Sequence, residues 1–126
     1  MPTEKVTGQR QLCYRMERFG YSRSEALKRG HDGIDPNEAA LIYFTDDAHG
    51  WLFATWELLS ALSLREQDFS RYSYMDDGGV YAEEDRDGTI LFRAFDKAFG
   101  DSCQAHSVYY GAPQNNPIRG FSRCGD

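Results

Sequence analysis

The sequence lacks several features that would assign it to a well-defined class of protein. No apolar run approaches the roughly 20 residues that a membrane-spanning helix needs. The first residues, Met1-Pro-Thr-Glu-Lys5, contain no apolar segment of a secretory signal. Cysteine is scarce and odd in number, with Cys13, Cys103 and Cys124 far apart, so a disulfide framework is not expected. These absences predict a cytoplasmic protein with reduced thiols and no membrane contact.

Motifs for common chemistries are missing as well. The chain has no Gly-x-Ser-x-Gly nucleophile motif, no phosphate-binding glycine loop and no calcium-binding loop. Zinc sites need four nitrogen or sulfur ligands, usually in closely spaced pairs. Only Cys103-x-x-His106 has such spacing, and its partners would be the distant Cys124 with His31 or His49. We therefore predict neither a metal nor a cofactor.

What is present is an acidic chain of 126 residues with an uneven charge distribution. The net charge is −6, and 40% of the residues are hydrophobic, enough for one domain with a modest core. Residues 31–104 contain sixteen acidic and five basic side chains. A negative region of this size either keeps the protein soluble or attracts a basic partner surface.

The first 30 residues predict a basic helical hairpin. Leu12, Met16 and Phe19 recur at helical spacing, and Gly20 follows as a stop. A second short helix is expected over 23–29. The segment holds seven Lys or Arg residues against three acids, which leaves open both a solvated surface and contact with nucleic acid.

Residues 39–121 predict an α+β body made of two hairpin-then-helix units and a last strand. Thr55 is the expected N-cap of the first helix, over 56–62, and Gly78 and Gly79 supply the second hairpin turn. A helix should end at Gly100, and 117–121 should be extended. The expected strands are 39–45, 51–54, 71–75, 80–84 and 107–110. We predict a single domain over 1–126, with an antiparallel sheet and helices on one face.

Acidic side chains cluster around the second hairpin and the start of the following helix. Helix capping and solvation explain part of this cluster, and a metal site or general acid would be alternative uses of it. We predict instead that these acids form a partner-binding surface. Its residues are Asp76, Asp77, Glu83, Glu84, Asp85 and Asp87.

Four segments resemble a family of small uncharacterised proteins from phages, plasmids and integrated elements. They are His49-Gly-Trp-Leu52, Tyr72-Ser-Tyr74, Val80-Tyr-Ala-Glu-Glu-Asp-Arg-Asp87 and Pro117-Ile-Arg-Gly-Phe121. The family carries no assigned activity, and it has Cys where this chain has Arg86. The resemblance implies the company of mobile elements, whose small acidic proteins often inhibit CRISPR or restriction systems.

Three functional hypotheses follow from these observations. The first is a non-catalytic inhibitor of a bacterial nucleic-acid-targeting defence complex of the CRISPR kind, whose acids dock on a Lys/Arg surface meant for DNA. The second is a small hydrolase that uses His49 with a nearby carboxylate, such as Asp46 or Asp47. The third is a DNA-binding regulator that uses the basic segment between Arg10 and Arg29.

Overall fold

A computed structural model describes residues 41–99 and 105–125 of the chain. The predicted helical hairpin over 1–30 lies outside the described residues. A mixed α+β class is confirmed. In chain order the elements are β1 (Leu41–Thr45), β2 (Gly50–Thr55), α3 (Trp56–Ala61), the 3-10 helix η2 (Glu66–Asp68), β3 (Tyr74–Asp76), β4 (Gly79–Glu83), α4 (Gly88–Phe99), β5 (Ala105–Tyr109), the 3-10 helices η3 (Pro113–Asn115) and η4 (Pro117–Gly120), and β6 (Ser122–Arg123).

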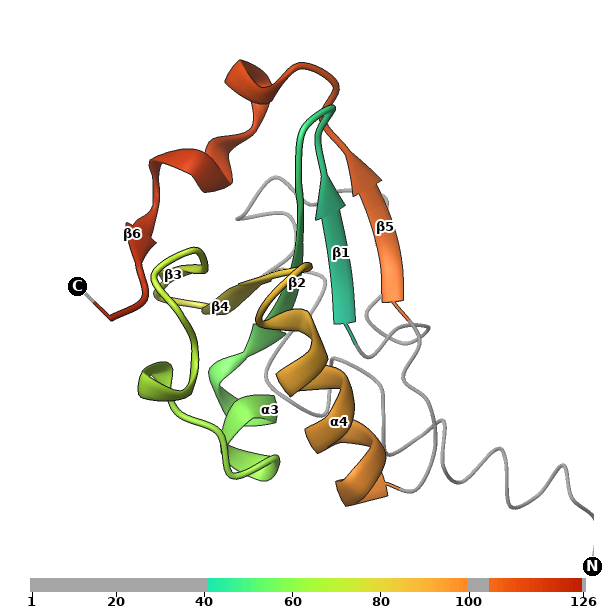
Figure 1. Cartoon of the computed structure of the whole chain (residues 1–126), viewed down its shortest axis with the longest axis vertical. Coiled ribbons are helices and arrows are strands. Elements are labelled where there is room, and N and C mark those ends of the chain that lie inside the picture. Colours follow the sequence, from blue (N-terminus) through green and yellow to red (C-terminus); the bar gives the residue numbers. More distant parts are fainter. Residues whose placement is uncertain (1–40, 100–104, 126) are drawn as a thin grey trace, which may run out of the picture.

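The strands form one six-stranded sheet in the order β5-β1-β2-β4-β3-β6 (Figure 1). Both predicted hairpins are present as antiparallel pairs, β1 with β2 and β3 with β4. The prediction of a wholly antiparallel sheet is wrong, because β5 lies parallel to β1. Helix α4 connects β4 to β5. A helical connection lets the next strand enter the sheet in parallel orientation, whereas a tight hairpin turn allows only antiparallel pairing.

The segment after β5 also differs from its predicted extended form. Residues Pro117–Gly120 make a 3-10 turn, in which the Asn116 side chain accepts a hydrogen bond from the Ile118 amide at 3.0 Å. The chain then adds β6 to the free edge of β3, with Ser122 opposite Met75. In Figure 1 this red segment runs from β5, at one edge of the sheet, to β6 at the other.

Both helices pack on the same face of the sheet. Leu58 and Leu59 of α3 share a buried cluster with Leu91 and Phe95 of α4. The sheet contributes alternate residues to it, Leu52 and Ala54 from β2 and Val80 and Ala82 from β4. This alternation is the period-2 pattern of a strand. Thr55 begins α3 as predicted, and its Oγ1 accepts a hydrogen bond from the Leu58 amide at 3.1 Å.

The opposite face of the sheet carries a second buried cluster, which is mainly aromatic. Phe44, Trp51, Phe53 and Tyr81 point to this side, and Ile118 of η4 packs among them. The rings of Phe53 and Tyr81 lie 4.7 Å apart between centroids. Strand β2 is therefore buried on both faces of the sheet. This packing holds the Trp51 end of the strand in place.

Candidate functional site

Asp46, in the loop between β1 and β2, is the centre of a buried polar network. Its carboxylate accepts hydrogen bonds from the Ala48 and His49 amides, at 2.9 and 3.0 Å. It also accepts from the Asn116 amide group at 3.0 Å and forms an ion pair with Arg119 at 2.8 Å. The Arg119 guanidinium holds the pKa of this carboxyl well below its usual range. The network ties the β1–β2 loop to the C-terminal segment.

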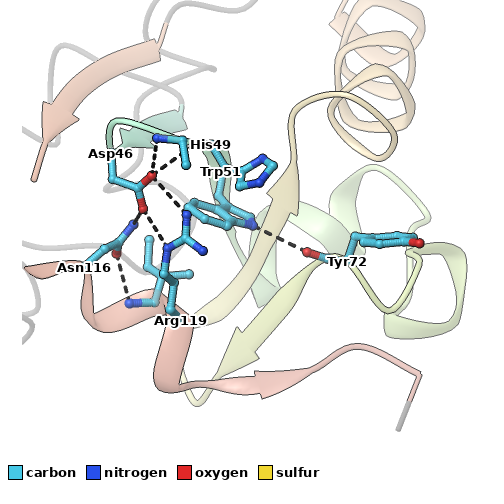
Figure 2. Close-up of polar contacts among 8 residues, drawn as sticks. Asp46, His49, Trp51, Tyr72, Asn116 and Arg119 are labelled. Carbon is cyan, nitrogen blue, oxygen red and sulfur yellow. Dashed lines mark hydrogen bonds and ion pairs between the residues drawn. The ribbon is translucent and has the colours of Figure 1, made fainter. Parts of the chain in front are cut away.

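This network places Arg119 and His49 on either side of one aromatic residue. Figure 2 shows Trp51 next to both side chains. The Arg119 Cζ atom lies 5.2 Å from the Trp51 ring centroid, and the His49 ring lies 6.0 Å from it. The indole N–H of Trp51 donates to the Tyr72 carbonyl oxygen at 3.4 Å. The start of β2 is thus held against the segment that leads into β3.

The junction between β4 and α4 is built around two buried carboxylates. Glu83 is 7% exposed, and its Oε2 accepts hydrogen bonds from the Asp85 and Arg86 amides at 3.1 and 3.0 Å. Asp87 is 3% exposed and accepts from the Ser70 amide and hydroxyl, both at 2.8 Å. The Ser73 hydroxyl also donates to Asp87 and accepts from the Glu83 amide. These bonds fix the turn in which Asp85 and Arg86 lie.

A pocket of about 320 Å³ lies between these two networks. It receives side chains from the β1–β2 loop, from β2, β3 and β4, from the β4–α4 junction and from the C-terminal segment. Its lining residues are His49, Trp51, Tyr72, Tyr74, Glu83, Asp85, Arg86, Arg119 and Arg123. Residues far apart in the sequence therefore meet at one place.

Three side chains of the pocket bring possible metal-ligating atoms together. One ligand atom from each of His49, Glu83 and Asp85 lies within 4.8 Å of the other two. The His49 and Asp85 side chains are exposed, whereas Glu83 is buried. An imidazole and two carboxylates are groups that can bind a cation or transfer a proton.

Each arginine of the pocket lies over an aromatic ring. The Cζ atom of Arg86 is 4.5 Å from the Tyr72 ring centroid, and that of Arg123 is 5.1 Å from the Tyr74 centroid. Unlike Arg119, these two form no ion pair with a carboxylate among the described residues. Glu83 and Asp85 likewise form none with an arginine or lysine in this part of the chain. The pocket is therefore lined by acidic and basic side chains that form no ion pair with one another among the described residues.

The six acids predicted as a partner-binding surface are divided by the fold. Asp76 and Asp77 lie at the turn that begins β4, and the other four lie at or beyond its end. A five-residue strand spans about 13–17 Å, so the two groups are separated. The Asp76 carboxylate takes part in this turn, where it accepts hydrogen bonds from the Gly78 amide and the Tyr81 hydroxyl, both at 2.9 Å.

Exposure divides the acids further. Glu83 and Asp87 are buried, whereas Asp77, Glu84 and Asp85 are exposed. Glu84 accepts a hydrogen bond from the Tyr43 hydroxyl, and partial burial, followed by the nearby Asp85 charge, raises its pKa. The acids that remain adjacent and exposed beside the pocket are Glu84 and Asp85.

The His49 ring lies near other carboxylates than Asp46 and Asp47, which its position in the sequence had suggested. Asp46 binds the His49 backbone amide, and the ring of His49 lies near Glu83 and Asp85. The pocket arginines were not predicted as site residues. Arg119 lies in the segment Pro117-Ile-Arg-Gly-Phe121 that carries the resemblance, but the resemblance implies no role for it. Nothing in the local sequence around Arg123 indicates a site. Arg119 and Arg123 become pocket residues because the fold brings the C-terminal segment next to His49 and the acids of the second hairpin. The sequence does not give these distances.

The comparisons with known proteins found no match. No family model, no curated protein and no solved structure is similar to this chain at a significant level. Within the described part of the chain, no helix has the length and apolar character to cross a membrane.

Proposed function

We propose that the protein is a binding protein whose ligand occupies the pocket and presents a phosphate group to Arg86 and Arg123. The observation that carries this proposal is the pair of guanidinium groups in the pocket without a carboxylate partner among the described residues. Guanidinium forks match phosphate oxygens in geometry and form charge-assisted hydrogen bonds with them.

The aromatic rings under these arginines support the same proposal. Tyr72 and Tyr74 hold the guanidinium groups by cation–π contact, which limits their freedom before a ligand arrives. Arg123 is also fixed by a hydrogen bond from Nη1 to the Arg71 carbonyl oxygen at 3.0 Å. A preorganised arginine loses less conformational entropy on binding than a mobile one.

The test is a titration of metal-free protein with inorganic phosphate and with adenosine monophosphate, followed by Trp fluorescence in a Trp56→Phe background. Trp51 then reports on the pocket that it lines. Arg86→Gln and Arg123→Gln should each weaken binding by about tenfold or more, because a hydrogen bond to a charged group contributes about 1.5–3 kcal/mol. Arg93→Gln, an exposed change on α4 outside the pocket, is the matched control.

Unchanged binding in the Arg86→Gln/Arg123→Gln double variant would contradict the proposal. So would the absence of saturable binding by the unsubstituted protein up to about 10 mM phosphate, which corresponds to a binding free energy of only a few kcal/mol.

A second candidate function is docking on a basic protein surface, as in a mobile-element inhibitor of a defence complex acting in the host cytoplasm. The exposed and adjacent positions of Glu84 and Asp85 favour it. Charge reversal of the buried Glu83 would remove the acceptor of the Asp85 and Arg86 amides and disturb the fold. The informative variant is therefore Glu84→Lys/Asp85→Lys. Asp77→Lys, at the other end of β4, is the control. Complex formation should weaken steeply with salt and fail only in the double variant.

A further inference from the structure

We infer that His49, Glu83 and Asp85 form a binding site for one divalent first-row transition metal ion, such as Mn²⁺ or Zn²⁺. This goes beyond the proposed phosphate binding, because the ion would use residues other than the arginines. The inference begins from one ligand atom of each side chain lying within 4.8 Å of the others. Ligands around one such ion, at about 2.0–2.2 Å from it, lie roughly 3 Å apart. His49 and Asp85 are exposed and can close this gap by rotamer changes.

The state of the Glu83 carboxylate is an independent reason to place a cation here. Glu83 is 7% exposed, and its Oε2 already accepts two backbone amides. Its other oxygen, Oε1, accepts no hydrogen bond from any described residue. Glu83 lines the pocket, and a cation bound there would pair with this Oε1, which has no partner among the described residues.

The surrounding contacts hold two of the three ligands in place. Asp46 fixes the His49 backbone through its amide, and the His49 ring packs near Trp51. The Ser73 hydroxyl accepts a hydrogen bond from the Glu83 amide at 2.9 Å, which fixes the end of β4. These contacts fix the backbone from which His49 and Glu83 project, and outer contacts of this kind orient metal ligands.

The donor set determines the class of ion. One imidazole nitrogen and two carboxylates suit Zn²⁺, Mn²⁺ or Fe²⁺ better than Ca²⁺ or Mg²⁺, which prefer oxygen ligands alone. Three protein ligands leave coordination positions for water or for a ligand in the pocket. Such an ion would also balance the Glu83 and Asp85 charges that no basic side chain of the described residues pairs.

The experiment is a titration of the chelator-treated full chain with MnCl₂, followed by loss of the Mn²⁺ electron paramagnetic resonance signal and by calorimetry. Mn²⁺ is the first probe because it avoids thiolates, so the cysteines do not compete. ZnCl₂ is the second probe, in a Cys13→Ser/Cys103→Ser background. We expect one site, with affinity lowered at least tenfold in His49→Gln and in Asp85→Asn.

The matched control is Glu84→Gln, which removes the neighbouring carboxylate charge without removing a ligand and should change affinity by less than threefold. Glu83→Gln keeps an acceptor for the two amides and should also lose the ion. If that variant does not fold, the exposed substitutions His49→Gln and Asp85→Asn still decide the question. Unchanged Mn²⁺ and Zn²⁺ affinity in both would overturn the inference, as would no binding of either ion at about 1 mM.

The metal site and the phosphate site can fail separately. Arg86→Gln should keep Mn²⁺ binding while it loses metal-free phosphate binding. His49→Gln should show the reverse. A protein that binds phosphate but no ion would retain the proposed function and reject only the metal site.

Discussion

Asp46 and Arg119, 73 positions apart in the sequence, are joined by two hydrogen bonds. Arg119 Nε donates to Asp46 Oδ2 at 2.8 Å, and Nη2 donates to Oδ1 at 3.1 Å. The carboxylate is fully buried, whereas the arginine side chain is 31% exposed. This pair connects the β1–β2 loop to the segment that leads to β6, and it holds the Trp51 side of the pocket.

Removal of the arginine should destabilise the fold. Arg119→Gln deletes two charge-assisted hydrogen bonds and leaves Asp46 with Asn116 and two backbone amides. We expect a loss of about 1.5–3 kcal/mol in the free energy of unfolding, measured by urea denaturation. Arg93→Gln on the exposed side of α4 should cost less than about 0.5 kcal/mol. An equal loss in the two variants would show that the ion pair contributes nothing specific.

The low pKa of Asp46 makes stability depend on pH in one direction. Its ordinary value is 3.8, and the folded value lies below that. The charged carboxylate therefore stabilises the fold fully above the ordinary pKa, and this contribution is lost as the pH falls below it. The denaturation midpoint should fall more steeply between about pH 5 and pH 3 in the unsubstituted protein than in Asp46→Asn. Parallel curves for the two proteins would contradict this assignment.

A backbone contact between β4 and the end of β2 makes Gly79 a sensitive position. A Cβ atom at Gly79 would lie 2.0 Å from the Ala54 carbonyl oxygen, so the backbone would have to move. Gly79→Ala should cost about 2 kcal/mol or more, by the same denaturation measurement. A Cβ atom at Gly120 would meet no heavy atom within 4 Å, so Gly120→Ala is the matched control. Similar stability of the two variants would argue against the close approach.

Local signals in the sequence were sufficient for several elements. Thr55 before an apolar run predicted a capped helix start, and paired glycines predicted the turn before β4. Both depend on residues within a few positions of each other, where backbone preferences act. The helices after the two hairpins were found for the same reason.

Contacts between distant segments were not predictable in this way. The parallel pairing of β5 with β1 and the addition of β6 to β3 depend on how the chain returns after α4. The roles of the individual acids in the acidic cluster were also not predictable, because the sequence does not distinguish a buried acid from an exposed neighbour. The folded chain buries Asp87 under Ser70 and Ser73 and leaves Asp85 exposed two positions away.

That difference between two acids predicts different effects of the same substitution. Asp87→Ala removes the acceptor of the Ser70 amide and hydroxyl and of the Ser73 hydroxyl, all in a buried site. We expect a loss of about 2–4 kcal/mol, because buried donors are left without a partner. Asp85→Ala should change stability by less than about 0.5 kcal/mol, since its side chain is exposed. The free energies of unfolding are measured by thermal or urea denaturation. Comparable losses in Asp87→Ala and Asp85→Ala would mean that burial does not make Asp87 more important for stability than Asp85.

Burial also determines the reactivity of Cys124. This residue is 0% exposed, and its thiol lies 3.7 Å from the Tyr74 carbonyl oxygen, to which it donates. Burial, followed by the charges of Glu66 and Asp87, raises the pKa of the thiol to about 12. Little reactive thiolate is therefore present near neutral pH. In a Cys13→Ser/Cys103→Ser background, Cys124 should react with an aromatic disulfide reagent at least a hundredfold more slowly in the folded protein than in urea. Rapid modification of the folded protein, at a rate close to that of a free thiol, would show that the segment carrying β6 opens from β3.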